Sequence, residues 1–267
     1  MKAQLTSWAA WGKVLGYFLV LWLATVLAGI IPSLNDLIFF FLVSLMVSWT
    51  FIHAEDRSIL SLGFVPRIKR DYKEFFSGVV IGGLMLITTV IFTLLLTKDH
   101  WSFNTQVDPI YVGIAFFTCL WSAFVQEFVF RGYPFQTLLK HYGPLTAQTF
   151  IAIPFGLMHL NGRMNLTDMA SAMLTTGLGS ILFGLAYLKT RKLFLPVGLH
   201  LGWNYAQQLI PRTVGEGNSG IIKIAAEHAN YSHLIIIGPY LVVVILAIAF
   251  FSNALRSKDI LGATQKT

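Results

Sequence analysis

Long apolar runs are the feature that most constrains how this chain can fold. An α-helix crosses the hydrocarbon core of a bilayer with about 20 apolar residues, and several stretches approach that length. They cover residues 13–31, 36–53, 75–97, 109–138, 144–160, 169–189, 193–210 and 233–255. These runs are too long for core strands, and strands of a membrane barrel would be about 10 residues long with alternating polarity. We therefore predict an all-α fold, a polytopic membrane bundle of about eight transmembrane helices.

Composition supports a membrane protein. Of the 267 residues, 55% are hydrophobic and only 12% are charged, whereas a soluble domain carries about 25% charged residues. The first apolar run is too long for a cleavable signal peptide and lacks a clear cleavage site, so we interpret it as the first span. The single cysteine, Cys119, excludes an intramolecular disulfide and a cysteine-rich zinc site.

The distribution of basic residues predicts the topology. With an even number of spans, both termini lie on one side of the membrane, and most Lys and Arg residues fall in segments on that side. They are Lys2, Lys13, Arg57, Arg67, Lys69, Arg70, Lys73, Lys140, Lys189, Arg191, Lys192, Arg256, Lys258 and Lys266. The other side holds only Lys98, Arg163, Arg212 and Lys223. Cytoplasmic loops are enriched in basic residues, so we expect both termini to be cytoplasmic. We expect the protein to lie in a bacterial inner (cell) membrane.

Three short motifs place polar residues inside the predicted spans, each with a spacing of one helical turn. They are Glu127 with Arg131 in AFVQEFVFRGY, preceded by Gln126; Phe155 with His159 in PFGLMHL; and His200 with Asn204 in LHLGWNY. Residues four apart share a helix face. Ionisable groups inside a bilayer are costly unless they are paired or face a cavity, which makes them functional candidates.

Each motif also has a purely structural interpretation. Glu127 and Arg131 could be an ion pair that only fixes packing, His159 an interfacial residue, and His200 with Asn204 an interhelical hydrogen-bonding pair. The helical rise of about 1.5 Å per residue allows the three motifs to share one layer of the bilayer, although His159 could lie higher than the others. Together they would suit hydrolysis, because a carboxylate with a histidine can act as a general base, and an amide with an imidazole can stabilise an oxyanion.

The motifs resemble those of the CPBP family of intramembrane proteases, which includes CAAX prenyl endopeptidases and bacteriocin-processing or immunity proteins. The resemblance covers residues 110–209 and rests on QEFVFRGYPFQTL, FGLMHL and GLGSILFGLAYLKTRKLFLPVGLHLGWNYAQ. It divides the chain into N-terminal transmembrane helices at 1–109, a CAAX-protease-like core at 110–209, and an external loop with a C-terminal helix at 210–267.

The resemblance implies an eight-helix bundle with a cavity open to membrane and cytosol, and peptide-bond hydrolysis without an acyl-enzyme. Mapped onto this chain, Glu127 and His159 would hold the attacking water, and His200 and Asn204 would stabilise the oxyanion. Arg131 would orient Glu127, and Phe155 would support the second motif. The implied partners are the bilayer and a membrane-associated peptide, such as a prenylated C-terminus or a bacteriocin leader, with no nucleic acid.

Gln126 departs from the family pattern, which has a glutamate at the first position of the acidic pair. Either Glu127 takes over the role of base, or the protein is a scaffold or immunity protein that binds a membrane partner without cutting it, or Gln126 is an engineered inactivating change. We favour protease chemistry because the other motif residues are all present. A transporter is the remaining class, but we find no internal repeat of the kind that transporters show.

No cofactor is firmly implied by these residues. Glu127, His159 and His200 could form a zinc site with an open position, but their spacing is not that of a H-E-x-x-H motif. A glutamate and histidine mechanism without metal suits the same residues, and we expect no obligatory metal.

Overall fold

The computed structural model describes residues 9–212, 220–225 and 231–264. It confirms the all-α fold. The helices are α2 (Ala10–Ile30), α3 (Leu37–Ala54), α4 (Lys69–Thr97), α5 (Pro109–Arg131), α6 (Tyr133–Leu157), α7 (Leu166–Thr190), α8 (Phe194–Leu209) and α9 (His233–Thr264). Two 3-10 turns, η1 (Pro32–Leu34) and η2 (Ile59–Leu62), and two short strands, β1 (His100–Phe103) and β2 (Ile222–Ala225), lie between them. Lys2 and Lys266, two of the basic residues on which the predicted topology rests, lie outside the described residues.

The helices follow the predicted apolar runs, with two differences. Among the described residues, 6 helical stretches are long and apolar enough to cross a membrane. That number is below eight because Pro109–Leu157 counts as one stretch and because α8, with 16 residues, is short for a span. The predicted run 109–138 is in fact split between α5 and α6, and α6 itself bends at Gly143.

Gly132 explains the break between α5 and α6. Its backbone leaves the helical region, with φ −70° and ψ −121°. A Cβ atom at this position would lie 2.2 Å from the carbonyl oxygen of Phe128, so only glycine fits without displacing backbone. Pro134 follows within the first turn of α6, where the missing N–H has no intrahelical partner to lose. The sequence RGYP therefore turns the chain directly behind Arg131.

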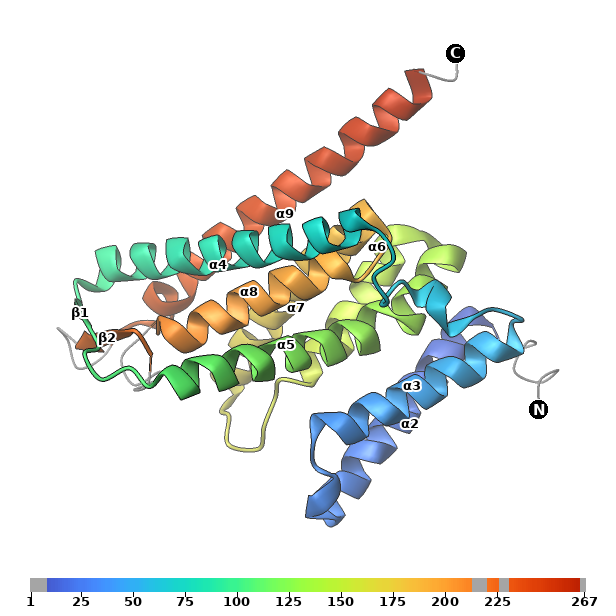
Figure 1. The fold of residues 1–267 in the computed structure, drawn as a ribbon, viewed down its shortest axis with the longest axis horizontal. Helices are drawn as coiled ribbons and strands as arrows, with labels where there is room; N and C mark the ends of the chain where they lie inside the picture. The colour runs from blue at the N-terminus through green and yellow to red at the C-terminus, as the bar shows by residue number, and fades with distance from the viewer. Residues whose placement is uncertain (1–8, 213–219, 226–230, 265–267) are drawn as a thin grey trace.

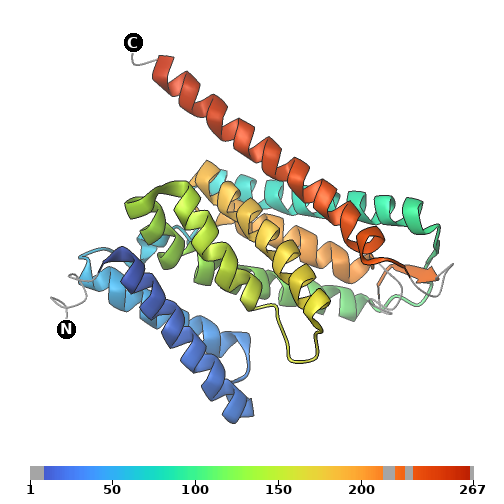
Figure 2. The same cartoon turned by 180° about the vertical axis from the view of Figure 1, so that it is seen from behind.

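Helix α8 lies in the middle of the bundle, between α4 on one side and α5 on the other (Figure 1). Helices α6 and α7 pack behind this layer, and α9 runs across it and extends past its edge (Figure 2). The α2–α3 pair packs beside α5 and α6. Strands β1 and β2 form an antiparallel pair at one end, with Trp101 opposite Ile224. The sequence analysis did not predict this small sheet.

The contact between α4 and α8 depends on glycines that bring the two backbones together. A Cβ atom on Gly202 of α8 would lie 2.1 Å from the carbonyl oxygen of Val79, and one on Gly82 of α4 would lie 2.2 Å from that of Leu199. Small residues at such crossings allow close approach of helices in membranes. These glycines fix the position of α8, which carries two residues of the third motif.

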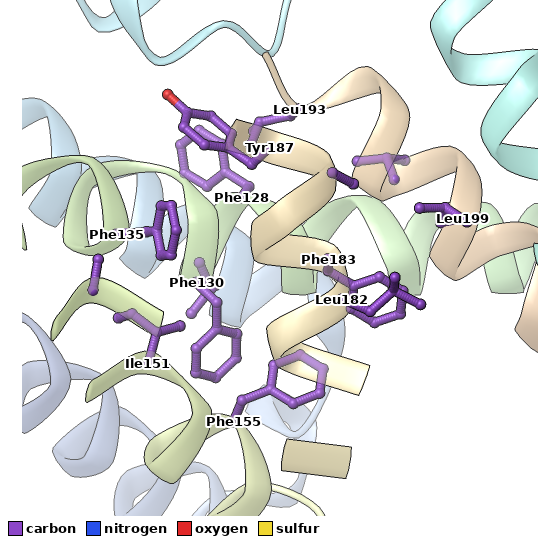
Figure 3. Close-up of a cluster of buried hydrophobic side chains, with 14 of the residues drawn as sticks. Phe128, Phe130, Phe135, Ile151, Phe155, Leu182, Phe183, Tyr187, Leu193 and Leu199 are labelled. Atoms are coloured by element: carbon purple, nitrogen blue, oxygen red, sulfur yellow. The ribbon is translucent and has the colours of Figure 1, made fainter. Parts of the chain in front are cut away.

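The core between α5, α6, α7 and α8 is rich in aromatic side chains (Figure 3). Phe130 meets Phe155 edge to face with ring centroids 5.0 Å apart, a favourable geometry for aromatic pairs. Phe155 and Phe183 lie next to each other at the lower edge of this cluster. Both are nearly fully buried, and both contact residues of the sequence motifs.

A charged cluster at the end of α3 joins three helices. The carboxylate of Glu55 accepts hydrogen bonds from Lys13 Nζ of α2 at 2.9 Å and from the hydroxyl of Tyr133 of α6 at 3.1 Å. Arg57 adds a third contact at 3.3 Å. Burial raises the pKa of Glu55, but the hydrogen bond and charge of Lys13, with the Tyr133 and Arg57 hydrogen bonds, outweigh it. The pKa is therefore lower than usual.

We expect Gly202→Ala to reduce folding and membrane accumulation strongly, because its methyl group would overlap the backbone of α4. Gly113→Ala in α5 is the matched control, since nothing lies within 4 Å of a Cβ atom there. Accumulation and thermal unfolding of both variants in detergent measure the difference. Equal stability of the two variants would contradict this account of the α4–α8 contact.

We expect the stabilising effect of Glu55 to depend on pH. A lowered folded pKa means that this contribution is complete above the ordinary pKa of 4.5 and is lost as pH falls through the folded pKa. Glu55→Gln should therefore lower the unfolding midpoint at pH 7, by about 2–4 °C for each kcal/mol lost, and the difference from wild type should shrink below about pH 4.

The control for Glu55 is Asp36→Asn. Asp36 caps α3 through a hydrogen bond to the N–H of Phe39, and asparagine is an equally good cap. It removes the same charge without breaking an interhelical contact. A pH-independent difference between Glu55→Gln and wild type would contradict the prediction.

Candidate functional site

Glu127 lies at the centre of the site and is completely buried. One of its oxygens, Oε1, lies 3.3 Å from Nη1 of Arg131, which is four residues later on α5, and 2.9 Å from Nδ1 of His200 on α8. Its other oxygen, Oε2, is buried and has no hydrogen-bond partner among the described residues. The buried carboxylate needs the contacts with Arg131 and His200, because an unpaired buried ion would cost several kcal/mol. The first and third motifs therefore meet through one carboxylate oxygen.

Arg131 connects this carboxylate to a third helix. Its Nη2 donates hydrogen bonds to both the carbonyl and the hydroxyl oxygen of Ser180 on α7, at 2.6 and 2.7 Å. The guanidinium carbon lies 4.8 Å from the ring centre of Phe155 and 5.4 Å from that of Phe183. Cation–π contacts of this kind are strongest where the cation is desolvated, as here. Sequence reasoning missed Ser180, whose only signal was a small hydroxyl residue inside an apolar span.

His200 is held by Glu127 on one edge and by an aromatic ring on its face. Its ring stacks on Phe183 at a centroid distance of 4.6 Å and an interplanar angle of 15°. Because a carboxylate only accepts, Nδ1 of His200 is the protonated nitrogen in this contact. The neutral ring then has an unprotonated Nε2, which can accept a proton. Phe183 is a second residue that the motif analysis did not identify.

His159 follows the end of α6 and turns back toward it. Its Nδ1 lies 2.7 Å from the carbonyl oxygen of Phe155. This contact explains the spacing of the second motif, because the backbone of Phe155 fixes the ring of His159 four residues later. A carbonyl oxygen also only accepts, so the same tautomer follows as for His200, with Nε2 as the basic nitrogen.

One cavity of about 110 Å³ brings the second and third motifs together. His159, His200 and Asn204 line it, with Phe155, Trp203 and Tyr240 among the surrounding residues. A water needs about 10–15 Å³ by this measure, so there is space for several waters or for a peptide group. His159 therefore shares a layer with His200, which depth estimates alone left open.

Gln126 and Glu127 are not among the described residues that line this cavity. Glu127 lies behind His200 and reaches the cavity only through that ring. The side chain of Gln126 donates from Nε2 to the hydroxyl oxygen of Ser122 at 2.9 Å. Its Oε1 is buried without a partner among the described residues. The departure from the family pattern thus falls on a residue that does not line the cavity.

In the part of the chain that the structure describes, no group of three or more His, Cys, Asp and Glu residues is arranged to hold a metal ion. Glu127 Oε1 and His200 Nδ1, two donor atoms of the zinc site considered from the sequence, are hydrogen-bonded to each other. With these two donor atoms occupied by each other, the residues as placed do not fit a zinc ion.

The apolar helices and the buried polar site define an integral membrane protein with a helical bundle. Residues 108–206, from the N-cap of α5 into α8, match the family model described as type II CAAX prenyl endopeptidase, Rce1-like. The match supports the resemblance to the CPBP family over this segment. No curated protein matches the chain.

We expect Arg131→Met to destabilise the fold by about 3–5 kcal/mol, because Glu127 would keep a buried charge without its cationic partner. The double variant Glu127→Gln/Arg131→Met should lose less than Arg131→Met alone, since it removes both charges. Arg163→Met, at an exposed position between α6 and α7, is the control. Thermal unfolding in detergent gives the comparison, and a double variant less stable than Arg131→Met would contradict a paired charge.

Proposed function

We propose that the chain is an endopeptidase that hydrolyses a peptide bond of a membrane-associated peptide within the cavity that α4, α6, α7, α8 and α9 line. The observation that supports this most is the pairing of His200 with a fully buried carboxylate at the wall of a cavity that also holds His159 and Asn204. A buried Glu–His pair whose imidazole faces a cavity is costly to maintain for packing alone.

In the proposed reaction, a water lies between the two imidazoles, and an unprotonated Nε2 takes its proton as the oxygen attacks the peptide carbonyl carbon. The amide of Asn204 donates a hydrogen bond to the oxyanion that forms. The imidazolium then transfers its proton to the leaving amine as the C–N bond breaks. Water is consumed, and the products are a carboxylic acid and an amine.

The geometry favours a positioning role for Glu127 in this proposal. From the sequence we expected Glu127 to activate the water directly, but its Oε1 contacts Arg131 and His200, and it does not line the cavity. In this arrangement it holds the ring of His200 in one tautomer and stabilises the imidazolium that forms after proton transfer. Residue 126 then does not need to be an acid, and the amide of Gln126 donates a hydrogen bond to the hydroxyl of Ser122.

The family match and the location of the site support a membrane-associated peptide as the substrate. A peptide whose cleavage site enters the membrane, carried by a prenyl group or by an apolar leader, would reach a cavity enclosed by spans. No observation favours the competing proposal of a scaffold that binds a partner without cutting it. Bacteriocin processing is one version of the leader-peptide proposal.

We expect purified wild-type protein to cleave members of a membrane-peptide library, including prenylated peptides. His159→Ala and His200→Ala should abolish cleavage while leaving folded protein. His141→Ala, at an exposed position on α6, is the matched control and should retain full activity. Cleavage by the His200→Ala variant at the wild-type rate would remove that residue from the mechanism, and no cleavage by wild type of any peptide would favour the scaffold.

The role of Glu127 is tested in the same assay with Glu127→Gln and with the double variant Glu127→Gln/His200→Ala. As a positioning residue, Glu127→Gln should lower kcat by about 100-fold or more, with little further loss in the double variant relative to His200→Ala. Gln126→Glu should leave cleavage near the wild-type rate. A large rise in rate with Gln126→Glu would instead show that the missing acid is the base.

A further inference from the structure

A second, larger cavity lies nearer the start of α8 than the catalytic candidates, where Phe194 and Val197 line it. Its volume is about 680 Å³, within the range of about 300–1,000 Å³ that is typical of ligand pockets. Its lining includes Phe194 and Val197 of α8 and residues of α4 and α5. Phe124, near the start of the first motif, lines it, but none of the candidate catalytic residues does.

The lining of this cavity is almost entirely apolar, and most of its side chains are aromatic. Tyr72 and Phe76 come from α4, and Phe117 and Trp121 come from α5. Tyr72, Phe76 and Phe117 are each more than half exposed, so the cavity opens on the outer surface of the bundle. In an integral membrane protein this surface faces acyl chains, and such a lining suits a hydrocarbon chain.

Basic side chains stand at one end of the cavity. Lys69 and Lys73 are exposed and precede the lining residues Tyr72 and Phe76 by three positions, which places them on the same face of α4. Lys69 is also the first residue of α4, where this span meets the membrane surface. Arg70, between them, pairs with Glu74 at 3.0 Å. The cavity thus combines an apolar interior with cationic groups where a lipid headgroup would lie.

We propose that this cavity binds one anionic phospholipid, with an acyl chain between α4 and α5 and its phosphate near Lys69 and Lys73. A neutral lipid would fill the same apolar space but would gain nothing from the two ammonium groups. Lysines near a membrane surface each favour anionic lipid by an amount that corresponds to about fivefold in affinity. This binding does not depend on the proposed function.

The test is native mass spectrometry of the detergent-purified protein titrated with phosphatidylglycerol and with phosphatidylcholine of the same acyl chains. Wild type should retain one phosphatidylglycerol at concentrations where phosphatidylcholine is lost. Lys69→Gln/Lys73→Gln should weaken phosphatidylglycerol retention by about 30-fold, following the fivefold effect of each lysine. Lys140→Gln/Arg256→Gln removes the same charge at exposed positions that do not line the cavity, and it should bind like wild type.

A second measurement places the acyl chain. Phosphatidylglycerol with brominated chains should quench the fluorescence of Trp121, so Trp121→Phe should lose part of the quenching that wild type shows. Leu120→Phe, which fills part of the cavity, should weaken retention, whereas glycerol phosphate without acyl chains should not compete.

Three results would overturn the proposal. Equal retention of the two lipids, or equal loss of phosphatidylglycerol in the lysine variant and its charge control, would show that the anionic headgroup does not contribute to binding. Quenching that is unchanged in Trp121→Phe would place the lipid outside the cavity. Displacement of phosphatidylglycerol by a prenylated peptide would assign the cavity to the lipid part of a substrate instead.

Discussion

The buried carboxylate of Glu127 is the interaction on which the site depends. It lies in a medium where an isolated charge is costly, and it is stabilised by a guanidinium on its own helix and by an imidazole from α8. Arg131 in turn is held by the carbonyl and hydroxyl of Ser180. Three helices thus meet at one charge cluster, and movement of α7 or α8 would break a hydrogen bond to one of the two buried charges. The same contacts that hold the bundle together fix the orientation of His200.

Helix α8 lines two cavities with different chemistry. His200 and Asn204 line a small cavity with polar groups, and Phe194 and Val197, nearer the start of the helix, line a larger apolar cavity together with residues of α4 and α5. The glycines of α4 and α8 set the distance between these helices, so backbone contact rather than side-chain packing positions α8. This division places the proposed peptide chemistry inside the bundle and the proposed lipid at its outer surface.

The site shows where sequence reasoning was sufficient and where it was not. The one-turn spacing within each motif correctly predicted the contacts of Glu127 with Arg131 and of Phe155 with His159, because helix geometry fixes such neighbours. It did not predict that Glu127 contacts His200, which is distant in sequence, or that Ser180 and Phe183 complete the surroundings of Arg131 and His200. The roles of Glu127, His159, His200 and Asn204 in catalysis remain predictions, as do the membrane orientation and the division of the chain at residues 109 and 209.

The sequence by itself determined the class of fold, because runs of about 20 apolar residues can satisfy their backbone hydrogen bonds in a bilayer only as helices. It also determined the candidate residues, because ionisable groups are rare at such positions. Only the tertiary structure decided that α8 lies between α4 and α5, and that His200 stands between Glu127 and the cavity. Those features depend on contacts between distant segments, such as the close backbone approach at Gly202, which no local pattern of residues specifies.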